Sequence, residues 1–124
     1  MCITKAIIPM MLFSLLTAPV FGELFDGNTL GKYCSHSDKN SSLLSEEEYA
    51  SYMLCLGVVL GIDSVRQVNS KIPRKTLYCP PEAFKSLQGI KVFNKYIENN
   101  PEKLHEPGSL LMIKSLMNAF PCKP

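Results

Sequence analysis

The chemistry available to this chain lies mainly in its cysteines. Besides Cys2, the sequence has Cys34, Cys55, Cys79 and Cys122, the nearest two of which are 21 positions apart. Zinc sites normally use close ligand pairs such as C-x2-C, so this spacing argues against a metal centre. A thiol hydrolase needs a free thiolate activated by a neighbouring base. Whether these cysteines are free or paired depends on the compartment in which the protein resides.

The first 22 residues have the features of an export signal. A short positive start is followed by an almost unbroken apolar run at residues 6–16, and small residues lead to a cleavage site after Gly22. The run is about 11 residues long, well short of the ~20 that a membrane-spanning helix needs. We predict a cleaved signal peptide at 1–22, one periplasmic domain at 23–124, and no membrane attachment after cleavage.

Export to an oxidising compartment decides the state of the cysteines. Cys2 leaves with the signal, so an even set of four remains in a mature chain of about 100 residues. In small exported domains such cysteines pair as disulfides. We therefore predict that Cys34, Cys55, Cys79 and Cys122 are all disulfide-bonded, and that the chain has no metal site, no cofactor and no catalytic residue.

The charge balance excludes several classes of partner. The signal removes one of the 13 basic residues, so the mature chain is almost balanced by its 11 acidic residues. A field this weak does not attract nucleic acid or an anionic membrane nonspecifically. Only two histidines and no glycine-rich loop are present, which also argues against a conventional enzyme. We predict a non-enzymatic protein that binds no nucleic acid.

Helical patterns occupy most of the mature chain. Ser45 and Glu48 have the spacing of a capping box at a helix start, and prolines mark the expected starts of two later helices. No stretch shows convincing alternation with a period of two, so we predict an all-α fold. The helices are expected near residues 27–33, 45–67, 80–99 and 107–120, with a loop at Val68–Leu77.

The expected helices select one of the three possible disulfide pairings. About seven residues join the last two helices, so we expect an antiparallel helical hairpin with Cys79 and Cys122 at its adjacent ends. Cys34 then pairs with Cys55. The chain-entropy model assigns about 3 kcal/mol to the shorter loop and about 4 kcal/mol to the longer one. The prediction is a small disulfide-stapled helical bundle ending in this hairpin.

The order of short motifs along the mature chain resembles a known family. GNTL precedes Cys34, the run CLGVVLGID starts at Cys55, CPP starts at Cys79, NPE and HEP occupy the turn before the last helix, and FPC ends at Cys122. Over residues 27–122 this order resembles the Rap/Tai family of periplasmic immunity proteins from bacterial type VI secretion systems. The resemblance implies a small helical protein that binds a cognate cell-wall amidase effector and blocks its active site.

Two segments depart from the family pattern. Val68–Leu77 aligns with no family motif, so the resemblance assigns no residue that contacts the effector. The helix after Cys55 is unusually aliphatic, and Gly57 and Gly61 lie four positions apart on one of its faces, where another helix backbone could come close. Dimers occur in the family, so a homodimer is a candidate assembly.

An inhibitor that plugs a cleft needs a rigid projecting element, because ordering a flexible loop subtracts from affinity. Val68–Leu77 is the first candidate. Pro73 stiffens its middle, and Lys71, Arg74 and Lys75 supply charges for the acidic rim of a partner. A solvated loop without a binding role is the alternative for these residues.

The turn at Asn99–Glu106 is the second candidate for the projecting element, with His105 as its contact residue or merely as a turn residue.

Two other functional classes remain open. Exported helical domains of this size can enclose an apolar ligand, for which the methionines would be suitable, so a small-ligand carrier is one alternative. A periplasmic chaperone is the other. An enclosed apolar cavity of roughly several hundred Å3, which is the usual size of a ligand pocket, would favour the carrier.

Overall fold

The computed structural model describes residues 25–71 and 76–123, which form a helical domain. Its α-helices are α1 (Gly27–Cys34), α2 (Glu46–Lys71), α3 (Ser86–Asn99) and α4 (Gly108–Ala119), with short 3-10 helices after α1 and before α4. The described residues form no strand beyond an isolated bridge between Asp26 and Pro107. The all-α prediction is confirmed. The predicted signal peptide and its cleavage site lie outside the described residues.

The start of α2 has the predicted capping box. The backbone N–H of Glu48 donates to Ser45 Oγ at 3.2 Å, and the Ser45 N–H donates to the Glu48 carboxylate at 3.0 Å. The helix continues past its expected end near Gln67 to Lys71. The loop predicted at Val68–Leu77 is therefore wrong for its first four residues. Asn and Ser weaken a helix only mildly, so the helix continues through Asn69 and Ser70.

The start of α3 is also later than predicted. Instead of beginning at the Pro80–Pro81 pair, the helix begins at Ser86. A proline disfavours helical backbone at the residue before it, so Pro81 keeps Pro80 out of a helix. The chain makes a single turn here, in which the Phe84 N–H donates to the Pro81 carbonyl at 3.0 Å. The turn places Phe84 edge-on to Phe120, with ring centroids 5.3 Å apart.

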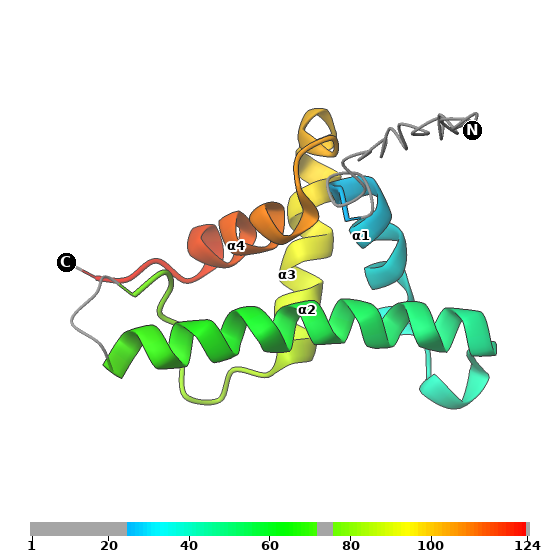
Figure 1. The fold of residues 1–124 in the computed structure, drawn as a ribbon, viewed down its shortest axis with the longest axis horizontal. Coiled ribbons are helices and arrows are strands. Elements are labelled where there is room, and N and C mark those ends of the chain that lie inside the picture. Colours follow the sequence, from blue (N-terminus) through cyan, green and yellow to red (C-terminus); the bar gives the residue numbers. More distant parts are fainter. Residues whose placement is uncertain (1–24, 72–75, 124) are drawn as a thin grey trace, which may run out of the picture.

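The four helices pack around one core, as Figure 1 shows. The long α2 (green) runs across α1 and α3, and α4 crosses α3 rather than lying along it. The last two helices therefore form a crossed hairpin and not the expected antiparallel one. The turn between them also holds the start of α1, because the Gly27 N–H donates to the Glu106 carbonyl at 2.9 Å and the Gly108 N–H donates to the Phe25 carbonyl at 2.6 Å. This contact directs α4 toward α1 as well as α3.

Both disulfides have the predicted pairing. Cys34–Cys55 joins α1 to α2 with Cα atoms 5.2 Å apart, and Cys79–Cys122 joins the two ends of the hairpin region with Cα atoms 4.9 Å apart. The first is fully buried in the core, whereas both cysteines of the second are exposed. The remaining buried apolar side chains come from all four α-helices and from the segment before Cys79: Leu30, Val59, Tyr78, Ile90, Phe93, Leu111, Met112 and Leu116.

Candidate partner-binding surfaces

The basic segment that the sequence singled out begins at the end of α2. Lys71 is exposed and is the last residue of that helix, where a positive charge complements the helix dipole. Pro73, Arg74 and Lys75 lie outside the described residues. Lys71 is thus presented to solvent by the end of a helix.

The described chain resumes at Thr76 and soon reaches a buried tyrosine. Tyr78 is fully buried, its hydroxyl donates to Asp63 at 3.1 Å, and the Arg66 guanidinium lies 5.4 Å from the centre of its ring. Burial, together with the negative charge of Asp63, raises the pKa of Tyr78 to about 12. The segment that follows Lys71 is therefore anchored by α2 before it and by Tyr78 and the Cys79 disulfide after it.

Asp63 is the centre of this anchor. Burial raises the pKa of the carboxyl, but hydrogen bonds from Arg66, Gln67 and Tyr78 outweigh burial, and the net pKa is lowered. The Arg66 contact is 2.7 Å and the Gln67 contact is 2.8 Å. Asp63 is therefore ionised at neutral pH and is shared between its own helix and the returning segment.

His105 belongs to a different part of the molecule. Its side chain is exposed in the turn before α4, and Figure 1 shows this turn beyond the top of α3, far from the end of α2 at the lower left. The turn is also bound to α1, because the carbonyls of Leu104 and Glu106 accept hydrogen bonds from the start of that helix. Lys71 and His105 consequently do not form one site, and the turn is less free to project than expected.

A larger exposed surface lies along α2. We define the α2 face as six exposed, uncharged residues at helical spacing: Met53, Gly57, Leu60, Gly61, Ser64 and Val68. The exposed fractions of Leu60 and Val68 are 49% and 57%. The opposite side of the helix enters the core through Cys55 and Val59. Sequence analysis noted the aliphatic character and the paired glycines of this helix but assigned it no binding residue.

The helix α2 is long and apolar. By length and composition alone it is the helix in the described part of the chain that is long and apolar enough to cross a membrane. Its disulfide from Cys55 to α1 and the buried Val59 make it an integral part of the packed domain. Its apolar residues therefore form two faces of one helix, one that packs in the core and one that is exposed to solvent.

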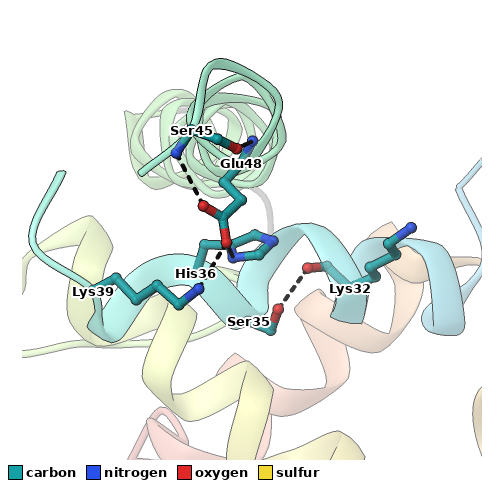
Figure 2. Close-up of polar contacts among 6 residues, drawn as sticks. All are labelled: Lys32, Ser35, His36, Lys39, Ser45 and Glu48. Carbon is teal, nitrogen blue, oxygen red and sulfur yellow. Dashed lines mark hydrogen bonds and ion pairs between the residues drawn. The ribbon is translucent and has the colours of Figure 1, made fainter. Parts of the chain in front are cut away.

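The acidic start of α2 is held against the segment that follows α1. Figure 2 shows Lys39 and His36 converging on Glu48, while Lys32 points away. Lys39 Nζ lies 2.7 Å and His36 Nδ1 3.6 Å from the Glu48 carboxylate. The hydrogen bond from Lys39, followed by that from the Ser45 N–H, lowers the pKa of Glu48 to about 2. An open groove of about 480 Å3 adjoins this cluster. Because Glu48 is already paired within the chain, the cluster is better suited to fixing the helix start than to binding a partner.

In the described residues, no three side chains of His, Cys, Asp or Glu gather in an arrangement able to hold a metal ion. The described residues also present the exposed, uncharged α2 face defined above.

Comparison with known protein families places the chain. A family model described as Rap1a immunity proteins matches residues 26–122, which span almost the whole described domain and all four disulfide-bonded cysteines. Neither the search of curated proteins nor the search of solved structures gave a match.

Proposed function

The chain belongs to the Rap1a immunity protein family, and from that premise we propose that it protects its cell by binding a peptidoglycan amidase effector of a type VI secretion system. An immunity protein acts by binding a toxin, and the proposed action is steric occupation of the amidase cleft. The chain itself performs no chemistry in this mechanism. The observation that carries the proposal is the family match across residues 26–122, since it covers the complete disulfide-bonded fold.

A periplasmic location follows from the same proposal. Amidase substrates lie in the cell wall, so the inhibitor has to be exported to meet the toxin. The two disulfides are consistent with an oxidising compartment. We propose that the signal is cleaved after Gly22 and that the mature chain begins at Glu23.

The proposed contact residues are those of the anchored segment, Lys71, Pro73, Arg74 and Lys75. Support comes from the rigidity of both attachments, because Lys71 ends a helix and Tyr78 is buried beside Asp63. A segment fixed at both ends loses less conformational entropy on binding than a free loop of the same length. His105 is the second-ranked contact, on a separate surface.

The alternative of a ligand carrier has less support. An apolar hollow lined by Gly61, Ile62, Val65, Leu77 and Ile113 holds about 140 Å3. Ligand pockets commonly span about 300–1,000 Å3, so this hollow is too small for a typical cargo. Tyr78, Phe93 and Met112 fill the centre of the domain instead.

The experiment that tests the function measures inhibition directly. The mature chain is titrated into a cell-wall amidase encoded beside it, and the release of peptidoglycan fragments is followed. Stoichiometric loss of activity supports the proposal, whereas full activity at saturating inhibitor overturns it. A heat-stable amidase of unrelated fold serves as the specificity control, because nonspecific protection of the peptidoglycan would slow both enzymes.

The experiment that tests the contact residues uses a charge reversal. Changing Lys71, Arg74 and Lys75 to glutamate should weaken binding to the amidase, most strongly at low salt where surface charges are least screened. Thermal stability should fall only slightly, since Lys71 stabilises the end of α2 by about 0.3–1 kcal/mol. If this variant binds as tightly as the parent at low salt, the segment is not the contact surface, and His105 becomes the next residue to change.

The second partner that we propose is another copy of this chain. A homodimer would cover exposed apolar surface that the isolated domain leaves in water, such as the side chains of Leu60 and Val68 on the α2 face.

A further inference from the structure

An open groove between α3 and α4 is rich in amide side chains and takes no part in the contacts proposed above. It holds about 330 Å3, a volume within the range of about 300–1,000 Å3 that ligand sites have. Its residues come from α3, α4 and the residue that follows α3, so the groove is separate from Lys71 and from the α2 face. Its polar lining has three asparagines and no carboxylate: Lys95, Tyr96, Asn99, Asn100, Ser115 and Asn118.

Part of this lining is held in place by the fold. The side-chain amide of Asn100 donates to the Tyr96 carbonyl at 2.8 Å, and its oxygen accepts from Lys103 at 2.7 Å. The hydroxyl of Ser115, which is only 1% exposed, donates to the Met112 carbonyl at 2.7 Å. These contacts fix the walls of the groove, so a ligand meets a surface that is already formed, as in most ligand sites.

The other polar groups are available to a ligand. Lys95 is exposed and makes no ion pair with another described residue, whereas Lys103 lies 3.9 Å from Glu102. Asn99 donates its amide to the Lys95 carbonyl at 2.9 Å, which leaves its side-chain oxygen as an acceptor. Asn118 is exposed near the end of α4. The groove thus offers one positive charge beside amide groups.

These groups together match one class of ligand. An amide side chain both donates and accepts hydrogen bonds, as do the acetamido group of a sugar and a peptide unit. The Lys95 ammonium attracts a carboxylate, and no carboxylate in the lining opposes it. Val92 and Ala119 add apolar contacts for C–H groups. A ligand that combines amides, hydroxyls and a carboxylate uses all of these features.

We propose that the groove between α3 and α4 binds an acidic muropeptide, which is an N-acetylated sugar carrying a short peptide with a free carboxylate. Lys95 pairs with the carboxylate, and Asn99 and Asn118 bond to the amide groups of the ligand. This inference goes beyond inhibition of an effector and takes from the proposed function only the location, because cell-wall fragments occur where a periplasmic protein works. Binding keeps the inhibitor beside the material that the amidase attacks.

The test follows the backbone N–H signals of the isotope-labelled mature chain by NMR, because these signals report where a weak ligand binds. N-acetylmuramyl-L-alanyl-D-isoglutamine, which has a free carboxylate, is added over a millimolar range. Signals of the groove residues on α3 and α4 should shift in a saturable way, while those of Lys71 and the α2 face should not. The same compound with its carboxylate amidated should bind roughly fivefold more weakly, the upper range for an exposed ion pair.

Three variants assign the binding to named groups. Lys95→Gln should weaken binding of the acidic compound roughly fivefold and leave binding of the amidated one unchanged. Lys85→Gln is the matched control and should bind like the parent, because Lys85 is exposed at the opposite end of α3, outside the groove. Asn118→Leu removes hydrogen bonds at similar size and should weaken both compounds on the order of fivefold. Circular dichroism should be unchanged in these variants, since the replaced side chains are exposed.

The inference is overturned if the groove signals do not shift, or if Lys95→Gln and Lys85→Gln bind equally well. N-acetyl-L-alanyl-D-isoglutamine lacks the sugar, and binding of this compound as tightly as the whole muropeptide would make the groove a site for acidic peptides instead.

Amidase inhibition is measured with the same variants and separates this inference from the proposed function. Lys95→Gln should inhibit like the parent, because the groove is separate from Lys71. A loss of inhibition in this variant would assign the groove to the effector and overturn the muropeptide site. Saturable muropeptide binding by a parent chain that does not inhibit would overturn the proposed function and support the site.

Discussion

Removing either disulfide should destabilise the domain, and burial reverses the order that loop length predicts. Loop entropy alone assigns about 3 kcal/mol to Cys34–Cys55 and about 4 kcal/mol to Cys79–Cys122. However, Cys34 and Cys55 are both fully buried, whereas both cysteines of the other pair are exposed. Replacing each buried cysteine by alanine also removes a packed sulfur, at about 1 kcal/mol per site. The variant Cys34→Ala, Cys55→Ala should therefore lose about 5 kcal/mol, by the sum of these two effects.

Equilibrium unfolding in urea, followed by far-ultraviolet circular dichroism, compares the two double variants. A difference of about 1 kcal/mol corresponds to about 4–8 °C in Tm for a domain of this size, so a thermal scan gives an independent check. Small domains have only about 5–15 kcal/mol of stability. The more destabilised variant is therefore also measured in trimethylamine N-oxide, which favours the folded state.

The reasoning is refuted if Cys79→Ala, Cys122→Ala proves the less stable variant, because loop length would then outweigh burial. Partial reduction gives a second readout on the same structural contrast. A water-soluble phosphine should open the exposed Cys79–Cys122 disulfide first, and mass spectrometry of alkylated peptides identifies which cysteines have reacted. Early alkylation of Cys34 or Cys55 would mean that the core opens before the surface disulfide does.

Three further outcomes are expected. The pKa of Glu48 is lowered from 4.5 to about 2 in the folded chain. Its stabilising contribution is therefore present above about pH 4.5 and is lost as the pH falls toward 2. Glu48→Gln should flatten this part of the curve of stability against pH, measured by urea unfolding. Gly108→Ala should cost about 1–3 kcal/mol of stability because its methyl would press against Leu30, whereas Gly57→Ala, whose methyl meets no neighbouring atom, should gain about 1 kcal/mol. Equal Tm shifts in the two variants would contradict the packing. Sequencing of the periplasmic protein should begin at Glu23, and recovery of only the full-length chain from the cytoplasm would exclude the export signal.

Local signals in the sequence predicted much of the fold. The capping box at Ser45 is present with both of its hydrogen bonds, and the last helix begins immediately after Pro107. These features depend on a few neighbouring residues and need no knowledge of the tertiary structure. The disulfide pairing was also predicted correctly, although the segment before α3, and not the helix start, brings Cys79 to the end of α4, where its N–H donates to the Phe120 carbonyl at 2.9 Å.

Two of the errors have a tertiary cause. The crossing of α4 over α3 depends on hydrogen bonds between the turn and the start of α1, roughly 80 positions away in the chain, a separation that local patterns do not report. The late start of α3 is similar, because Phe84 contributes more by packing against Phe120 than by extending the helix. The extension of α2 to Lys71 has a local cause, because weak helix formers do not by themselves determine where a helix ends.

The candidate site was only partly predictable, because charge is visible in a sequence and exposure is not. The basic residues around Lys71 form a cluster that is visible in the sequence, whereas the residues of the α2 face have the composition of a core helix. Leu60 and Val59 are neighbours of the same chemical type, yet one is half exposed and the other fully buried. Helical periodicity does not separate them when both sides of a helix are apolar, so the structure was needed to show which side faces water.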